Sequence, residues 1–562
     1  MSNIPVLIDY IEANGRFTVK APPWLVDQCR SIPSRRFVKT TRIWVAPGTR
    51  INAAYLLRVF SAAEWTRGAQ AAATTLTTRE TEEDLPPFPA WYQFKTKPFQ
   101  HQLTALNKAW PRSKFALFME MGTGKTKTAI DLASCRAMDN QIGAALIVCP
   151  LVVVRNWQRE IEMHSSIHAD VYTVSGKDVT KESEIHKGGI ELADRMRWII
   201  VNIEALSQGN TYKTLIDYIA DQRIMSIVDE SSRIKNHKAM RTKRCIRIGE
   251  HSKSALVLSG TPVLQGPIDL YSQFEFLDTN IIGIGDYYCF RNRYAVMGGF
   301  NGKQIIGYQN TEELMALLKP YVYQILKRDA LDLPDKVYTR LPVKLTAAQH
   351  AVLKTLKGGI KLDGKDISNV LERVLRMQQA VAGFNPVSDD EPNKRIIPLE
   401  EDPKLLALLE ITEEAQGSVV IWTQFVQQAK DAAMALELQA PGQVELHIGE
   451  MKPKERDAAI QRFERGERRF FISTLAAGGI GINLVRASTV VYLGNSWSLE
   501  HRLQSEDRSH RIGQTRSVQY IDILAEGSVD KLVEMALLEK KGLAQYVQEA
   551  LRENADQLRG LI

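Results

Sequence analysis

The chain contains the sequence Met121-Gly122-Thr123-Gly124-Lys125-Thr126 between a short apolar run at 115–118 and a segment with helical periodicity at 127–138. This order predicts a buried parallel strand, a glycine-rich turn and a helix, which together form the local structure of a phosphate-binding loop. Met119 stands where the strict loop pattern has glycine, and an ordinary helix cap is the alternative.

The residue types in this loop suit a nucleoside triphosphate bound with Mg²⁺. Glycines let backbone N–H groups curl around phosphates, lysine reaches the terminal phosphates, and a threonine hydroxyl can ligate Mg²⁺. We therefore predict an ATP site in which Lys125 is catalytic and Thr126 is a metal ligand. The predicted nucleotide-binding residues of the loop are Gly122, Thr123, Gly124, Lys125 and Thr126.

A second β-like run, at 223–228, ends at Asp229-Glu230. Two carboxylates at the end of a buried strand are costly unless they have partners. Beside a phosphate-binding loop they gain a function, because Asp229 can hold Mg²⁺ and Glu230 can orient or deprotonate the attacking water. A solvated strand end is the alternative.

A third segment lies much later in the chain, at 504–514. Its two arginines, Arg508 and Arg511, are three residues apart, which predicts that they lie on one face of a helix. A nucleotide site built from both ends of a chain suits a motor, since hydrolysis must then open and close a cleft.

These segments resemble the ordered motifs of the Swi/Snf-type ATPases of helicase superfamily two. The resemblance runs from about residue 97 to residue 530. The sequence Asp229-Glu230-Ser231-Ser232-Arg233-Ile234-Lys235-Asn236 is similar to that family's Asp-Glu-Ala-His-Arg-Ile-Lys-Asn. The other matching segments are the Q motif at 97–102, motif Ia at 146–151 and 156–161, motif III at 258–262, motif IV at 420–425 and motif V at 473–484.

The resemblance implies an α/β fold with two RecA-like lobes that contain parallel sheets, with helical insertions and a small α+β N-terminal domain. It also implies ATP and Mg²⁺ as cofactors. Gln102 would read the adenine, Gly481 and Gln504 would contact the nucleotide, and the arginines would act as fingers on the phosphates. The implied catalytic residues are Lys125, Asp229, Glu230, Arg508 and Arg511, and the implied metal ligands are Thr126 and Asp229.

The sequence departs from the family pattern at three places. Ser231-Ser232 replaces Ala-His and removes a histidine that often links hydrolysis to motif III. The family's Asp…Trp-Asn-Pro segment reads Gly494-Asn495-Ser496-Trp497-Ser498, and its double arginine reads Leu326-Lys327-Arg328-Asp329. These changes bear on coupling and on DNA contacts, whereas the groups that contact ATP are retained.

Length and composition are those of a multidomain globular protein. The 562 residues are too many for one core and suggest three or more domains. The sequence has no apolar run long enough to span a bilayer and no signal peptide, so a cytoplasmic protein of bacterial or viral origin is expected, or a nuclear one if eukaryotic. The five cysteines form no Cys-x-x-Cys pair, which argues against structural zinc and disulfides.

The predicted domains follow from the motifs and from shifts in composition. They are a small basic α+β module at 1–68, a linker at 69–92, a first RecA-like lobe at 93–335, a helical protrusion and linker at 336–400, a second RecA-like lobe at 401–530 and a C-terminal helix at 531–562. Within the N-terminal module, alternation predicts strands at 16–20 and 42–45, and residues 52–65 read as a helix.

The N-terminal module carries most of the chain's excess positive charge. Residues 1–68 contain ten Lys or Arg and four Asp or Glu, a surplus of six against a net charge of +7 for the whole chain. The segments 31–37 and 42–47 resemble the small HARP-type domain of annealing translocases. Clustered arginines with Phe37 and Trp44 offer phosphate contacts and stacking surfaces, so the module is predicted to bind nucleic acid. The alternative is that both rings belong to the module's own core.

We expect an ATP-dependent translocase on double-stranded DNA, which would remodel forks, branches or protein–DNA complexes. Its partners would be double-stranded or forked DNA, gripped on the phosphates through motifs Ia, IV and V, with an unidentified protein partner and no membrane. The alternatives are an ATPase that recycles RNA polymerase, a strand-separating helicase and a non-catalytic DNA-binding scaffold.

Overall fold

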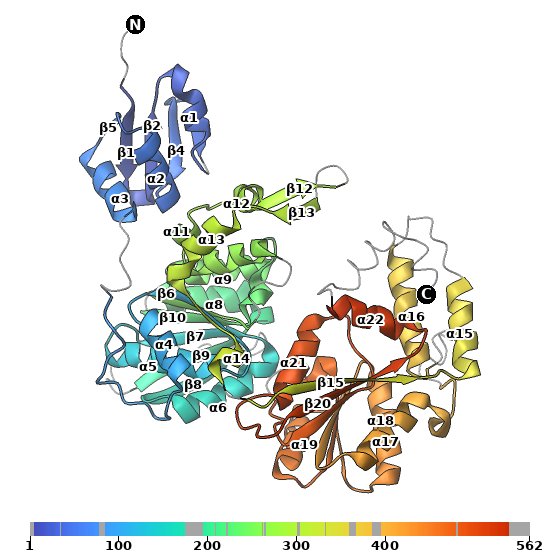
Figure 1. Ribbon diagram of the computed structural model, residues 1–562. Coiled ribbons are helices and arrows are strands. Elements are labelled where there is room, and N and C mark those ends of the chain that lie inside the picture. Colours follow the sequence, from blue (N-terminus) through green and yellow to red (C-terminus); the bar gives the residue numbers. More distant parts are fainter. Residues whose placement is uncertain are drawn as a thin grey trace. The chain divides into compact units, whose positions relative to one another are not determined.

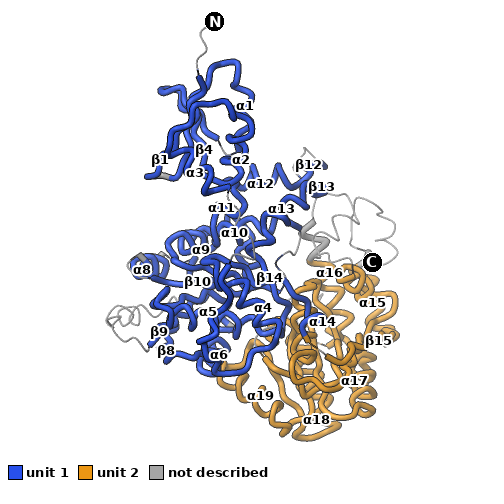
Figure 2. Tube along the Cα trace, turned by 60° about the vertical axis from the view of Figure 1, so that its left-hand side comes forward, with its two compact units in different colours: residues 1–330 blue, residues 331–562 orange. Residues whose placement is uncertain are grey.

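The computed structural model divides the chain into two compact units, residues 1–330 and 331–562, which are described separately (Figure 2). The structure describes residues 5–33, 35–77, 85–174, 195–207, 209–220, 223–260, 262, 266–299, 304–331, 333–358, 367–384, 395–478 and 482–538. No helix among these residues is both long enough and apolar enough to cross a membrane.

The N-terminal domain is a five-stranded sheet with helices packed on it. In sheet order the strands are β3 (Arg36–Val38), β4 (Ile43–Pro47), β2 (Arg16–Lys20), β1 (Leu7–Ile11) and β5 (Glu64–Trp65). The helices are α1 (Val26–Arg30), α2 (Arg50–Val59) and α3 (Arg67–Thr77). The core is built from one face of the sheet, including Ile8, Phe17 and Val19, and from apolar residues of the helices.

Two expectations for this region are wrong. The helix expected at 52–65 ends at Val59, and Glu64–Trp65 is strand β5, which pairs with β1. The expected linker at 69–92 begins with α3, because the small side chains of Ala69 and Ala73 are buried in the domain's core. Further along the expected linker, Phe88 packs against Trp110 of the first lobe. Residues 78–84, which follow α3 in the chain, lie outside the described residues.

The first lobe is built on a seven-stranded parallel sheet (Figure 1). In sheet order its strands are β14 (Val322–Ile325), β6 (Lys114–Met119), β11 (Ser254–Leu258), β10 (Ile224–Asp229), β7 (Ala144–Cys149), β9 (Arg195–Asn202) and β8 (His168–Val174). Every residue of β7, β10 and β11 is buried. This burial explains why these strands read as continuous apolar runs rather than as alternating ones.

Helices cover this sheet in two groups. The first group is α4 (Gln100–Ala109), α5 (Lys125–Met138) and α6 (Val154–His164), and the second is α8 (Gly209–Ala220), α9 (Met240–His251) and α10 (Tyr271–Leu277). The lobe is completed by α11 (Thr279–Ile282), α12 (Tyr287–Tyr294), the hairpin β12 (Ala295–Gly298) and β13 (Gln304–Tyr308), α13 (Thr311–Leu318) and α14 (Lys327–Ala330). The strands expected at 115–118 and 223–228 and the helix expected at 127–138 are confirmed.

The second unit has a six-stranded parallel sheet of its own. In sheet order the strands are β15 (Lys336–Val343), β20 (Val518–Ala525), β19 (Ala487–Tyr492), β16 (Ser418–Thr423), β18 (Phe470–Thr474) and β17 (Val444–His447). The helices that follow these strands along the chain include α17 (Pro403–Glu414), α18 (Val426–Gln439), α19 (Pro453–Arg465), α20 (Leu475–Gly478) and α21 (Leu499–Ser509). The expected α/β fold with two parallel sheets is confirmed.

The segment at 336–400 is only partly the helical protrusion that we expected. It begins with β15, which pairs with β20 along eight residues and is therefore part of the second sheet. Two helices follow, α15 (Ala347–Gly358) and α16 (Ile367–Val381), and their apolar faces share a core with α22 (Val529–Leu538). The predicted C-terminal helix thus packs on its lobe over 529–538, and its remainder lies outside the described residues.

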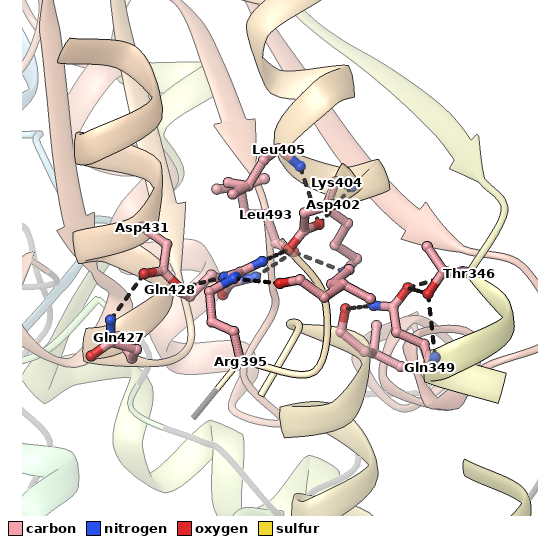
Figure 3. Close-up of polar contacts among 12 residues, drawn as sticks. Thr346, Gln349, Arg395, Asp402, Lys404, Leu405, Gln427, Gln428, Asp431 and Leu493 are labelled. Carbon is pink, nitrogen blue, oxygen red and sulfur yellow. Dashed lines mark hydrogen bonds and ion pairs between the residues drawn. The ribbon is translucent and has the colours of Figure 1, made fainter. Parts of the chain in front are cut away.

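A buried polar cluster fastens the end of the 336–400 segment to the second sheet (Figure 3). Arg395 forms ion pairs with Asp402, the N-cap residue of α17, and with Asp431 of α18. Lys404 donates to the carbonyl oxygen of Leu493, and its ammonium lies 2.6 Å from Asp530. Each buried charge therefore has an opposite charge beside it.

Candidate nucleotide site

The phosphate-binding loop has the predicted form. It leaves the sheet at the end of β6 and enters α5 at Lys125, and both Gly122 and Gly124 have left-handed backbone angles, with φ of 79° and 85°. The side chain of Lys125 is 9% exposed, and its ammonium donates to the carbonyl oxygen of Met119 over 2.9 Å. The lysine is thus held across the loop, where a bound phosphate would replace a neutral carbonyl as its partner.

Residues of α4 lie directly against this loop. The side-chain amide of Gln102 donates to the carbonyl oxygens of Thr123 and Gly124, at 3.3 and 3.4 Å, and its own oxygen accepts from the N–H of Phe99. A Cβ atom at position 124 would lie 2.0 Å from that amide nitrogen and would displace the Gln102 side chain, and the left-handed backbone angle at position 124 favours glycine. The structure therefore brings Gln102 to the loop, and its contact with adenine stays a prediction.

His101 is a contact residue to which the sequence assigned no role. Its Nε2 atom lies 2.7 Å from the carbonyl oxygen of Thr123, and the ring stacks on Phe99. Its place beside Gln102 in the Q motif was the one signal in the sequence. Gln102 and His101 together fix the backbone of the loop from one side.

The two carboxylates lie at the end of β10, next to β11 and β7 in the sheet. Oδ2 of Asp229 accepts a 2.8 Å hydrogen bond from the indole N–H of Trp157 on α6. Burial raises the pKa of Asp229, while the bond from Trp157 and the positive charge of Lys125 oppose that rise. Trp157 belongs to motif Ia, and no feature of the sequence indicated that it would bond to the predicted metal ligand.

Glu230 has a strained backbone. Its φ and ψ angles are 52° and 56°, which is the left-handed region that non-glycine residues rarely adopt. It is 7% exposed, and its backbone N–H donates to Asp229. Strained conformations of this kind cost about 1–3 kcal/mol and cluster at functional sites. The strain is independent evidence that Glu230 has a task.

Motif III follows β11 and comes close to the lysine. A Cβ atom at Gly260 would lie 3.4 Å from the ammonium of Lys125, so the segment after β11 borders the phosphate-binding loop. Thr261 lies outside the described residues. Within this lobe the structure thus gathers Lys125, Gln102, the Asp229-Glu230 pair and the start of motif III at the ends of neighbouring strands.

The residues present suit Mg²⁺ bound together with a nucleotide. Mg²⁺ is usually held by one or two carboxylates plus substrate phosphates and waters, rather than by a complete protein cage. Among the described residues no group of three or more His, Cys, Asp or Glu is placed to hold a metal ion. Asp229 at the end of β10 is a carboxylate of the kind that this mode of binding uses, and Thr126 at the start of α5 stays a predicted ligand.

The arginine segment of the second unit corrects one expectation. Helix α21 ends at Ser509, so Arg508 is in its last turn while Arg511 lies in the turn that follows, and the two do not share one helical face. Arg508 is 7% exposed, and its Nε–H donates to the carbonyl oxygen of Gln504. Gln504 in turn donates to Glu500.

Motif V and the arginine segment are joined within the second unit. The backbone N–H of Leu484 donates to the carbonyl oxygen of Arg508 over 2.9 Å. The side-chain amide of Gln514 donates to Val485, Ala487 and Ser509. Gly481 lies outside the described residues, but the segment that follows it is fixed to the arginine helix.

Two family models match the chain, and together they cover most of its length. A model of the SNF2-related domain matches residues 101–386, and one of the helicase conserved C-terminal domain matches residues 403–513. The second match lies within the second unit, and the first contains the phosphate-binding loop and the carboxylate pair.

Curated relatives share about a quarter of the aligned residues. An uncharacterized ATP-dependent helicase of Mycoplasma genitalium is 26% identical over 74% of this chain and 38% of its own length. The putative ATP-dependent helicase/translocase YwqA of Bacillus subtilis is 26% identical over 76% of this chain and 46% of its own length. The chain thus spans less than half the length of these relatives.

A solved structure, the SWI2/SNF2 ATPase core of Sulfolobus solfataricus in complex with dsDNA, is 24% identical, with a TM-score of 0.38, and covers 85% of this chain and 99% of that chain. The family rests on the sequence models, which match more than half of the chain in the predicted order. The chain belongs to the SNF2-related, or Swi/Snf-type, ATPases of helicase superfamily two.

Proposed function

We propose that this chain hydrolyses ATP with Mg²⁺ and uses the energy to translocate on double-stranded DNA. The observation that carries the proposal is the arrangement at the strand ends of the first lobe. A glycine-turned loop with a buried lysine and a strained, buried carboxylate beside a second carboxylate is suited to phosphoryl transfer to water.

Each residue of the first lobe would have a separate task. Lys125 would exchange its bond to Met119 for the terminal phosphates, and the loop's N–H groups would bind the remaining phosphate oxygens. Bound Mg²⁺ would supply charge neutralisation at the phosphates. Asp229, oriented by Trp157, would hold that ion, and Glu230 would orient the attacking water and accept its proton.

The second unit would contribute positive charge late in the reaction. Arg508 and Arg511 would stabilise charge on the transferred phosphoryl group when the lobes close around ATP, with Gln504 and Gly481 at the nucleotide. Closing and reopening would then shift the grip of one lobe on DNA relative to the other. Relatives named helicase/translocase and chromodomain-helicase-DNA-binding protein 1-like (Danio rerio, 25% identical over 76% of this chain) support DNA as the track.

A pair of DNA substrates tests the proposal. The purified chain should displace a third strand from a triplex in an ATP-dependent way and should leave a simple tailed duplex intact. Its ATPase should respond to duplex or forked DNA more than to single strands or RNA. Unwinding of the tailed duplex, with stimulation only by single strands, would instead identify a strand-separating helicase.

The N-terminal domain is proposed to add affinity for DNA through phosphate contacts. Pairing of Phe37 with Trp44, and of Trp44 with Val19, puts these aromatic residues on the core face of the sheet, where their rings lie 4.8 Å apart. Arg16, Lys20 and Arg36 are at alternate positions and lie on the opposite face. These cations are placed for phosphate contact, and Phe37, which is 42% exposed, keeps base stacking on its ring within the proposal.

Deleting residues 1–77, the whole folded domain, should leave ATPase activity in place but weaken DNA binding, with a shallower salt dependence. The triple variant Arg16→Gln, Lys20→Gln and Arg36→Gln should reproduce this loss without removing the fold. Unchanged DNA affinity with an unchanged salt dependence would indicate that the domain binds a protein partner instead of DNA.

A further inference from the structure

One buried hydrogen bond lies next to the strained carboxylate and has no counterpart in the family pattern. The hydroxyl of Ser231, the residue after Glu230, donates to the side-chain oxygen of Gln273 on α10 over 2.6 Å. Both side chains are fully buried, at 0% exposure. The family pattern has alanine at position 231, which could not make this bond.

Gln273 is a bridge rather than a single contact. Its amide nitrogen donates to the carbonyl oxygen of Pro262, at 2.8 Å, and to that of Asp269, at 2.9 Å. The side-chain amide of Gln273 thus bonds to the hydroxyl of Ser231 and to two backbone carbonyls. In a fully buried place each of these bonds is costly to lose, because the partner left behind has no water to bind.

The segment that Gln273 holds on its other side belongs to the same site. Pro262 comes two residues after Gly260, which borders the ammonium of Lys125. Gln273 therefore spans the distance between the residue that follows Glu230 and the segment that borders the phosphate-binding lysine. A second tie runs parallel to it, since the hydroxyl of Ser272 donates to the carbonyl oxygen of Lys235.

We propose that Ser231 and Gln273 are positioning residues for Glu230. A left-handed glutamate persists only where its surroundings over-determine the backbone. Ser231 fixes the backbone immediately after Glu230 by its bond to Gln273. Gln273 connects this backbone to the segment beside Lys125 by its bond to Pro262. In this protein the bonds from Ser231 to Gln273 and from Gln273 to Pro262 provide a link to motif III, where the family pattern has a histidine at position 232. The inference rests on the proposed role of Glu230.

The test compares Ser231→Ala, Gln273→Leu and the double variant in the full-length chain. Each single variant should lower kcat for ATP hydrolysis by about 10- to 100-fold, because a displacement of the order of 1 Å at a reacting group costs this much. The KM for ATP should change little, since neither side chain is proposed to touch the nucleotide. The double variant should be no slower than Gln273→Leu, because the two side chains act through one bond.

Ser226→Ala is the matched control. Ser226 is on β10, the strand that ends just before Glu230; it is fully buried and shares a 2.6 Å hydrogen bond with Ser252, but it lies four residues before Glu230. It should lower the melting temperature about as much as Ser231→Ala while leaving kcat near that of the parent chain. Equal effects of the two variants on kcat would reduce the Ser231 bond to a general structural role.

Glu230→Gln in the same assay separates this inference from the proposal beneath it. If Glu230→Gln is inactive while Ser231→Ala and Gln273→Leu turn over like the parent chain, the positioning role is wrong and the role of Glu230 stands. If Glu230→Gln turns over normally, the assignment of the site itself is wrong. Multiplicative effects in the double variant would also overturn the pairing.

Discussion

Buried charged residues are bonded differently at two places, the strand ends of the first lobe and helix α21 of the second. In the first lobe, Lys125 and Asp229 are bonded to neutral groups, a backbone carbonyl and an indole N–H. In the second lobe, Arg502 and Glu506 of α21 are bonded to opposite charges. Arg502 forms ion pairs with Glu506 and Asp522, and Glu506 also pairs with Lys336 of β15.

The difference indicates which charges are available to a ligand. A charged group that is bonded only to a neutral dipole is stabilised further when a group of opposite charge binds beside it. A charged group inside an ion-pair network is already compensated. Burial opposes ionisation of Glu506, but the charges of Lys336 and Arg502 hold its pKa below the usual range. We therefore assign Arg502 to the fold, whereas the proposed roles of Arg508 and Arg511 in the chemistry rest on their places in the family motif.

The largest expected effect is in the first lobe. Lys125→Ala and Glu230→Gln should each lower kcat for ATP hydrolysis by about 10³-fold or more, because transition-state charge and the attacking water lose their partners. Glu230→Gln should still bind ATP, which equilibrium binding of a fluorescent ATP analogue would show. Turnover near the parent rate in either variant would show that the substituted residue of the first lobe is not needed for hydrolysis.

The next largest effect is expected from the arginines of the second lobe, which fall into two classes. Arg508→Ala and Arg511→Ala should lower DNA-stimulated turnover by about 10³-fold, with a smaller change in ATP affinity and little change in stability. Arg502→Ala should instead cost about 3–5 kcal/mol of unfolding free energy, since it removes both ion pairs of Asp522 and Glu506 with Arg502 and leaves Glu506 with Lys336 as its one charged partner among the described residues. Thermal melts and saturation kinetics on the same three proteins distinguish the two classes. Loss of ATP binding alone would make Arg508 and Arg511 ground-state contacts.

A smaller effect is expected from the group that orients the metal ligand. Trp157→Phe removes the N–H that Asp229 accepts, and it should raise the Mg²⁺ concentration needed for half-maximal turnover by about 10- to 100-fold. Trp198→Phe is the control, because Trp198 is also fully buried but its indole nitrogen has no hydrogen-bond partner in the described part of the chain. The same Mg²⁺ requirement in both variants would show that Asp229 does not depend on Trp157.

The smallest expected effect is a loss of stability at acidic pH. Burial, followed by the charge of Arg456, lowers the pKa of His447 on β17 to about 4 from its ordinary 6.5. The unfolded chain therefore binds this proton at a higher pH than the folded chain, and stability falls as pH decreases from 6.5 towards 4. This histidine should cost about 2 kcal/mol between pH 7 and pH 5. Urea unfolding at both pH values should show a smaller acid loss for His447→Gln; an identical loss would exclude His447 as its source.

Much of the first lobe could be predicted, because its signals are local. The apolar runs at 115–118 and 223–228 became β6 and β10, and the glycine pattern fixed the loop between β6 and α5. Gln102 was recognisable because it belongs to a short motif close to the loop. Each of these predictions depended on neighbours within a few residues along the chain.

What escaped prediction depends on contacts between distant segments. The bond between Trp157 and Asp229 joins residues 72 positions apart, and the bond between Ser231 and Gln273 joins residues 42 positions apart. The place of Arg511 beyond α21 was missed because spacing alone does not show where a helix ends. The alanine- and threonine-rich α3 read as a linker because its small side chains matter only once the N-terminal domain packs against them.

The pairing of β15 with β20 has a practical consequence for recombinant fragments. The segment that matches the helicase C-terminal family, 403–513, contains neither strand of this pair, and a fragment that begins at 401 keeps β20 without β15. Such a fragment would present the unpaired N–H and C=O groups of β20 along eight residues, and an open strand edge of this length promotes aggregation. It would also lack Lys336 and Tyr338, which donate hydrogen bonds to Glu506. An independently folding second lobe should therefore begin before Lys336 and extend through α22.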